Sequence, residues 1–248
     1  MGDSNQNRSD KLTGSRNILI FGAIAAMLVA AGSIADIFIG TALGGDLNSI
    51  PQTAVGRFTQ IHRNPLLGLY YFDLLNVVIT LILIPAFYAI FFLHLKNNQP
   101  LAQLSMILFI IGTAVFVVNN SALTMLELSN KYFSASNDAE RNLIASAGEA
   151  FLARGAHGSA AVFFGFILPI IADIILSFVM LQGKIFAKLN SYLGIIGNFL
   201  LLIYMILVTF VPGMKSMAMI IAAPGGLMII AWLIMSAIKL FRLSALSK

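Results

Sequence analysis

Long apolar runs, separated by short polar segments, divide the chain. Six of these runs are about 20 residues or longer, the length that crosses a hydrocarbon core of about 30 Å. They cover residues 18–43, 66–95, 101–128, 150–181, 192–211 and 217–240. None alternates polar and apolar residues as a strand of an outer-membrane barrel does. Because a helix satisfies its own backbone hydrogen bonds in lipid, the pattern predicts an all-α fold with six transmembrane helices in one bundle.

The two ends of the chain are polar. Residues 1–16 are rich in Ser, Asn and Asp and hold too few apolar side chains to fold alone, so we predict a disordered tail. The six-helix domain then covers residues 17–243, and residues 244–248 form a second short tail. The first apolar run is about twice as long as the core of a signal peptide, so we expect it to be retained as a span.

Composition and charge agree with a lipid environment. The 248 residues are 59% hydrophobic and 10% charged, whereas soluble domains are about 45–50% apolar. The net charge is +5, but the basic residues are scattered among the connecting segments, so we expect no nucleic-acid partner. If the N-terminus lies inside, nine Lys and Arg residues are cytoplasmic and six are external. We therefore predict cytoplasmic termini in a multi-pass protein of the cell inner membrane, with lipids as partners.

Polar side chains inside the predicted spans gather in the half of the bundle that this topology turns outward. A charged residue at the bilayer centre costs about 3 kcal/mol even on insertion scales, so such residues usually face partners or water. The candidate ligand-binding residues are Asp36, Asp73, Asn76, Asn119, Asn120, Glu127, Arg154 and His157. The asparagines have an alternative role as hydrogen-bonding contacts between helices. Arg154 and Asp73 lie at similar predicted depth, so we expect them to form an ion pair, with Asp36 as the next candidate.

Three further features concern the same bundle. Asn137 and Glu140 have the spacing of a capping box and open an amphipathic helix, which is either a surface helix or a lid over the outer mouth. The triplet from Pro224 to Gly226 is expected to kink or unwind the sixth span. Asp173 lies toward the inner half, where it either pairs with a lysine at the interface, Lys184 or Lys188, or forms the inner station of a proton path.

No catalytic residue, metal site or cofactor is expected. The chain has no cysteine, which excludes disulfides, iron–sulfur clusters and thiol catalysis. Zinc needs three or four converging ligands, but His94 falls at the opposite end of the bundle from His62 and His157. Ser159 lies two positions from His157, so the two side chains point apart on a helix, and no nucleophile elbow surrounds the serine.

Several runs of residues carry a resemblance to a known family. They are Asn119–Leu126, Leu128–Phe133, Ala139–Arg141, Ala147–Ala150, Ile175–Leu181 and Tyr192–Gly197. With these runs the chain resembles a family of uncharacterised bacterial six-span membrane proteins, a domain of unknown function. The resemblance covers spans two to six. It implies a six-helix bacterial inner-membrane protein and carries no activity, substrate or cofactor.

The sequence leaves three kinds of function open. The first is binding or transport of a small or amphipathic molecule in a polar cavity of the outer half, with Arg154 and His157 as cationic contacts and Asp36 and Asp73 as acidic ones. The second is a membrane-embedded enzyme that uses the Asp and His residues. The third is a structural or accessory subunit, in which polar residues fix only helix register. The oligomeric state is not determined by the sequence.

Overall fold

The computed structural model describes residues 2–42, 50–155 and 159–246, with backbone alone for residues 2–14, 160, 161 and 215. The described residues form ten α-helices and no strand, which confirms the all-α fold. Six of the helices are long and apolar enough to cross a membrane. These are α1 (Gly2–Ala42), α4 (Leu74–His94), α5 (Gln99–Asn119), α8 (Ala160–Gly183), α9 (Lys188–Phe210) and α10 (Lys215–Leu246).

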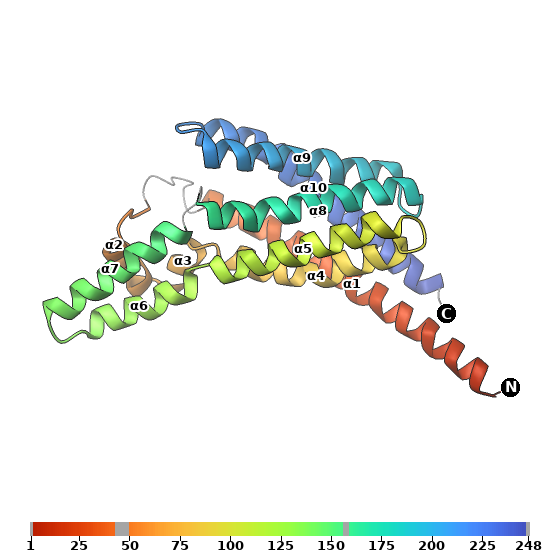
Figure 1. Cartoon of the computed structure of the whole chain (residues 1–248), viewed down its shortest axis with the longest axis horizontal. Coiled ribbons are helices and arrows are strands. Elements are labelled where there is room, and N and C mark those ends of the chain that lie inside the picture. Colours follow the sequence, from red (N-terminus) through yellow and green to blue (C-terminus); the bar gives the residue numbers. More distant parts are fainter. Residues whose placement is uncertain (1, 43–49, 156–158, 247–248) are drawn as a thin grey trace.

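The six long helices form a closed ring that follows the order of the chain. Helix α1 packs on α4, α4 on α5, α5 on α8, α8 on α9 and α9 on α10, and α10 returns to pack on α1. Figure 1 shows these helices side by side, with the N- and C-termini at the same end of the bundle. The assignment of that end to the cytoplasm stays a prediction.

Apolar side chains fill the centre of the ring. Helix α1 contributes alanines, including Ala23, Ala26 and Ala30, so that its neighbours approach closely. Phe87 of α4 stacks on Phe109 of α5 with ring centroids 4.1 Å apart. Both rings are fully buried. The centre is therefore a packed core and not an open pore.

Four shorter helices gather at the end of the bundle opposite the termini (Figure 1). They are α2 (Ala54–Arg63), α3 (Pro65–Tyr70), α6 (Ala122–Ser134) and α7 (Asp138–Gly155), and we call them the cap. A second apolar cluster, separate from the bundle core, holds the cap together and includes Phe58, Ile61, Phe72 and Met125. The cap thus has a small hydrophobic core of its own, continuous in sequence with the spans.

The helix bounds differ from the predicted spans on both sides of the cap. The second long helix begins at Leu74 and not at residue 66, because Asp73 has a left-handed backbone (φ 65°) that separates α3 from α4. The third long helix ends at Asn119, and residues 122–128 of the predicted span belong to α6. The fourth begins at Ala160, since residues 138–155 form the separate helix α7. Of these apolar residues, Leu69, Ala122, Met125 and Leu126 pack within the apolar cluster of the cap.

The first and last helices also differ from expectation. Helix α1 begins at Gly2, although a disordered tail was predicted for residues 1–16. Once an apolar helix has formed, each added residue gains a backbone hydrogen bond, so a polar segment can continue it. Helix α10 runs unbroken through Pro224, so the predicted unwinding there is wrong. Gly225 instead allows close packing, because a Cβ there would lie 3.0 Å from the carbonyl oxygen of Gly197 on α9.

Candidate functional site

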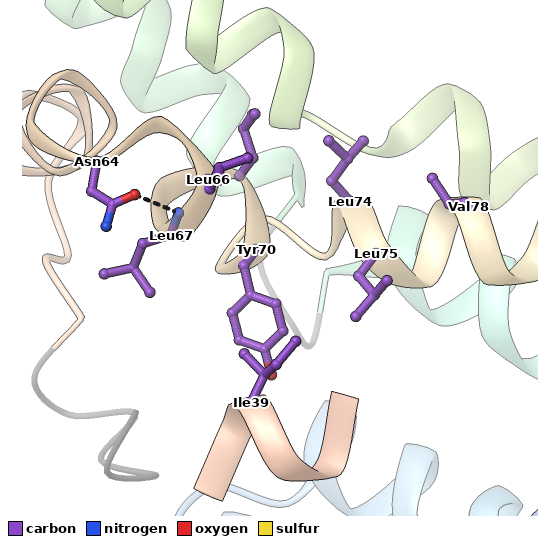
Figure 2. Close-up of a pocket in the computed structure, with 9 residues that line it drawn as sticks. Ile39, Asn64, Leu66, Leu67, Tyr70, Leu74, Leu75 and Val78 are labelled. Atoms are coloured by element: carbon purple, nitrogen blue, oxygen red, sulfur yellow. Dashed lines mark hydrogen bonds between the residues drawn. The ribbon is translucent and has the colours of Figure 1, made fainter. Parts of the chain in front are cut away.

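Tyr70 connects the cap to the first span. Asn64 caps α3 by accepting a hydrogen bond from the Leu67 N–H at 3.1 Å, and Pro65 occupies the first turn, where no N–H is needed. The short helix that results points Tyr70 toward α1 (Figure 2). Its hydroxyl donates to the backbone oxygen of Asp36 at 3.3 Å. A polar contact therefore lies where α1, α3 and α4 meet.

Two carboxyl groups flank Tyr70. Asp73 precedes α4 and makes no capping bond, and its Oδ1 accepts a hydrogen bond from Asn76 Nδ2 at 2.8 Å. Burial raises the pKa of Tyr70 to about 12, and the nearby charges of Asp36 and Asp73 add to this rise. Neither carboxyl group forms an ion pair within the described part of the chain. The structure thus brings together three predicted site residues, Asp36, Asp73 and Asn76, around a tyrosine that the sequence did not single out.

An apolar groove begins beside Tyr70. Its volume is about 490 Å³, and its lining is almost entirely aliphatic. The lining residues are Ile39, Asn64, Leu66, Leu67, Leu69, Tyr70, Leu74, Leu75 and Val78. Figure 2 shows the leucines of α3 and α4 around this space, with Ile39 of α1 beneath Tyr70. Leu66 is 82% exposed and Val78 is 47% exposed, so the groove opens on the outer surface of the bundle.

Asn119 and Asn120 form the joint between α5 and α6. Asn120 donates from Nδ2 to the Phe72 carbonyl at 2.7 Å, and its Oδ1 accepts from the Ala122 N–H at 3.0 Å. Asn119 donates to the Val115 carbonyl of its own helix at 2.8 Å. Asn120 therefore fixes the chain at this bend, which is the alternative role considered for the asparagines, whereas the bond from Asn119 to Val115 stays within α5. Neither lines the groove.

The predicted ion pair between Arg154 and Asp73 is not formed. Arg154 is exposed at the end of α7, and its Nε donates to Asn119 Oδ1 at 2.9 Å. The prediction failed because α7 ends at Gly155 in the cap, so Arg154 does not lie within a span. Glu127 also lies away from any cavity, exposed on α6 and 2.7 Å from Lys131 Nζ. His157 lies outside the described residues.

Helix α7 packs on α2 and α6 as the surface helix of the cap. The Asn137 Oδ1 accepts a hydrogen bond from the Glu140 N–H at 2.9 Å, and Glu140 Oε2 accepts from the Ser136 N–H at 3.1 Å, which confirms reciprocal capping. The other end is fixed by Glu149, whose Oε1 accepts a hydrogen bond from the Ala54 N–H of α2 at 2.7 Å. Helix α7 contributes no residue to the groove. It is therefore no lid over that groove.

A buried arginine of the cap was missed by the sequence analysis. Arg57 of α2 is 7% exposed, and its guanidinium lies over the Phe72 ring, 4.5 Å from the centroid. It donates to Gln60 Oε1 at 3.0 Å and to the Tyr71 carbonyl at 3.3 Å. Burial lowers the pKa of Arg57 to about 10. Arg57 fixes the segment that carries Tyr70 and Asp73, so it supports the site without lining the groove.

Asp173 lies near the middle of α8, far from the lysines proposed as its partners. It is 9% exposed on α8, about 20 Å from the start of the helix at 1.5 Å per residue. Lys184 and Lys188 are exposed beyond the other end of α8, so the predicted ion pair is absent. The ion pair fails on distance, because Asp173 precedes Lys184 by eleven residues, about 16 Å along the helix at 1.5 Å per residue.

The arrangement defines a multi-pass helical membrane protein: six apolar helices in a ring, with a four-helix cap at one end. Among the described residues no group of three His, Cys, Asp or Glu side chains could hold a metal ion. Residues 19–236 match the family model described as Domain of unknown function (DUF4386), so the chain belongs to this family. Comparison with curated proteins and with solved structures gives no match.

Proposed function

We propose that this protein binds an amphipathic molecule with a cationic head group at the groove beside Tyr70. The single observation that carries the proposal is the junction of an apolar groove with two carboxyl groups that have no cationic partner in the described part of the chain. The aliphatic lining suits an alkyl or acyl chain, since burial of each CH₂ group is worth about 0.8 kcal/mol. Asp36 and Asp73 suit an ammonium group near Tyr70.

Binding, and not conduction, is the activity that this geometry supports. The groove lies on the surface of the bundle, while the core of the bundle is filled by side chains such as the stacked Phe87 and Phe109 and by Trp232. A molecule held in the groove therefore has no open path across the ring. Transport of the bound molecule would need the helices of the ring to separate, which is a second step beyond the proposed binding.

A pair of probes of equal chain length tests the proposal. A long-chain alkyl trimethylammonium should bind the purified protein more tightly than an alkyl maltoside of the same chain length, measured by native mass spectrometry. The double variant Asp36→Asn and Asp73→Asn should weaken binding of the cationic probe about fivefold to tenfold, equivalent to about 1 kcal/mol. The double variant should leave the affinity for the neutral probe unchanged, because the apolar lining is intact.

Two controls separate the groove from general surface effects. Glu127→Gln removes a carboxylate from the exposed face of α6 and should change the affinity for neither probe. Leu75→Trp fills the groove and should weaken both probes. Equal affinity of the two probes, together with no effect of the Asp36 and Asp73 changes, would refute the proposed head-group site.

A further inference from the structure

Buried polar side chains line the contacts among α8, α9 and α10. They are Asp173, Ser177, Asn190, Ser191, Asn198, Trp232 and Ser236, each 9% exposed or less. Five of their atoms have no hydrogen-bond partner among the described residues: Asp173 Oδ1, Ser177 Oγ, Asn190 Oδ1, Ser191 Oγ and Trp232 Nε1. Buried polar groups in proteins are nearly always hydrogen-bonded. Five such atoms on three adjacent helices therefore make this region the candidate for a second functional site.

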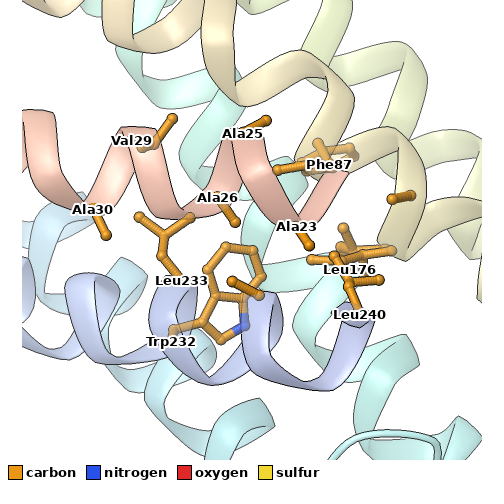
Figure 3. Packing of buried hydrophobic residues seen from close by; sticks show 14 of the residues in the cluster. Ala23, Ala25, Ala26, Val29, Ala30, Phe87, Leu176, Trp232, Leu233 and Leu240 are labelled. Carbon is orange, nitrogen blue, oxygen red and sulfur yellow. The ribbon is translucent and has the colours of Figure 1, made fainter. Parts of the chain in front are cut away.

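Three of these residues converge on Gly194 of α9. A Cβ at Gly194 would collide with Ser177 Oγ of α8 and would lie 2.7 Å from Trp232 Nε1 of α10. Asn198, one turn further along α9, donates from Nδ2 to the Gly194 carbonyl at 2.9 Å. Figure 3 shows the Trp232 indole lying among Ala23, Ala26 and Leu240, so its nitrogen is a polar atom within an apolar core.

The helix register places Asp173 next to this meeting point. Asp173 lies one turn from Ser177 on the same face of α8. Helices α8 and α9 are antiparallel neighbours (Figure 1), so the contact of Ser177 with Gly194 sets Asp173 opposite Asn198. Both residues lie about 15 Å from the α8–α9 connection at 1.5 Å per residue. The carboxyl group is therefore held near the middle of the bundle.

Buried polar side chains continue from Asp173 toward one end of the bundle. Toward the end that holds the termini lie Ser177, then Asn190, which donates to Ser236 Oγ at 2.9 Å, and Ser191. Toward the cap, buried apolar side chains follow on the same helices, including Ile170 and Ile230. A row of hydroxyl and amide groups thus lies between the carboxyl group and the end of the bundle that holds the termini. Toward the cap, the next polar side chains of α9 are Tyr204 and Thr209, and Tyr204 lies about 9 Å beyond Asn198 at 1.5 Å per residue.

Ionisable side chains on the surrounding helices lie at other levels of the bundle. Among the residues whose side chains the structure describes, they are Tyr88 and His94 on α4, Lys188, Tyr192 and Tyr204 on α9, and Lys239 and Arg242 on α10. Helix α5 has none, and the charged residues of α7 belong to the cap. In the described part of the chain none of them forms an ion pair with Asp173. No fixed cation is therefore available to neutralise this carboxylate.

We propose that Asp173 is a proton-binding site, filled from the end of the bundle that holds the termini. A hydronium ion gives its proton to a carboxylate oxygen of Asp173, which leaves a neutral carboxylic acid and one water molecule, and release reverses this step. The neutral acid can remain buried without a cation, whereas the carboxylate cannot remain there unpaired without a large desolvation cost. Hydroxyl and amide groups of the row both donate and accept hydrogen bonds, so they can guide the proton.

Dicyclohexylcarbodiimide tests this proposal in the purified full-length protein. The reagent takes the proton of a buried carboxylic acid on one nitrogen, the carboxyl oxygen bonds to its central carbon, and transfer of the acyl group to nitrogen gives a stable N-acylurea. We expect one adduct on the α8 peptide, located by peptide mass spectrometry, with a yield that falls as the pH is raised. Asp173→Asn should abolish this adduct, while the matched variant Asp36→Asn should retain it.

The adduct is also mapped on peptides of the labelled protein without any substitution, so the test does not depend on how a variant folds. Absence of an adduct on the α8 peptide, or a yield that does not change between mildly acidic and alkaline pH, would overturn the proton site. Protection by sodium chloride at constant pH, with no protection by choline chloride, would also overturn it, in favour of a sodium site. The groove plays no part in this labelling, so its outcome is independent of the proposed function.

Discussion

Replacement of Asn120 by Ala should destabilise the protein much more than the same change at the neighbouring Asn119. Asn120 bonds across the fold, to the Phe72 carbonyl at 2.7 Å, and caps α6 through the Ala122 N–H at 3.0 Å. Each hydrogen bond of this kind contributes about 1 kcal/mol net, so Asn120→Ala should cost about 2 kcal/mol. Asn119 bonds within its own helix and to the exposed Arg154, so Asn119→Ala should cost about 0.5 kcal/mol.

The assay is hydrogen exchange of the purified protein in detergent, read by mass spectrometry. Asn120→Ala should speed exchange in α6 and in residues 71–76, because Asn120 ties these two segments together. The matched control is Asn130→Ala, at an exposed asparagine on α6, and it should change the exchange rate in neither of these two segments. Equal effects of Asn119→Ala and Asn120→Ala would refute the reasoning, since they would show that the bond to Phe72 does not fix the joint.

Three other predictions follow from the site and the packing around it. Stability should fall as the pH rises from 10 to about 12, because Tyr70 ionises later in the folded state than in the unfolded state, and Tyr70→Phe should flatten this part of the thermal-midpoint curve. Arg154→Gln and Asp73→Asn should have additive effects on the thermal midpoint, and partial recovery in the double variant would restore the rejected ion pair. Gly225→Leu should lower the thermal midpoint by forcing α10 away from Gly197, corresponding to about 1–3 kcal/mol, whereas Gly226→Leu, at a position with open space, should be the milder change.

Run length in the sequence was sufficient to identify the six spans but not to locate their ends in the cap. The leucines of residues 66–69 and the apolar side chains of residues 122–126 continue the adjoining apolar runs without a break. In the structure the first group lines the groove and the second contributes to the cap cluster. Hydropathy reports that a side chain avoids water, and it does not distinguish lipid from a small protein core. The left-handed Asp73 that separates the two environments has no sequence signal of its own.

The proximity of three candidate residues was predictable from the sequence, and their role in binding a ligand stays a prediction. Asp36, Asp73 and Asn76 do lie together, because charged and amide groups in apolar runs tend to meet partners. Arg57 had a usable signal, because it lies three residues after Ala54, on the same face of a helix as Phe58 and Ile61. The polar contacts among α8, α9 and α10 depend on which serines and asparagines face inward. That choice is made by packing at Gly194, and a single sequence does not reveal it.

The ring of helices in chain order has a consequence for biogenesis. Helices that emerge from the ribosome one after another can each associate with the one just before, so five of the six contacts need only neighbours in sequence. The sixth contact, between α10 and α1, joins the first and last helices of the ring and can form only after α10 has been synthesised. Until then the alanine-rich face of α1 has no partner from α10. A chain that stops before α10 should therefore insert normally and yet be recognised as incomplete by membrane quality control, because closure of the ring depends on its last helix.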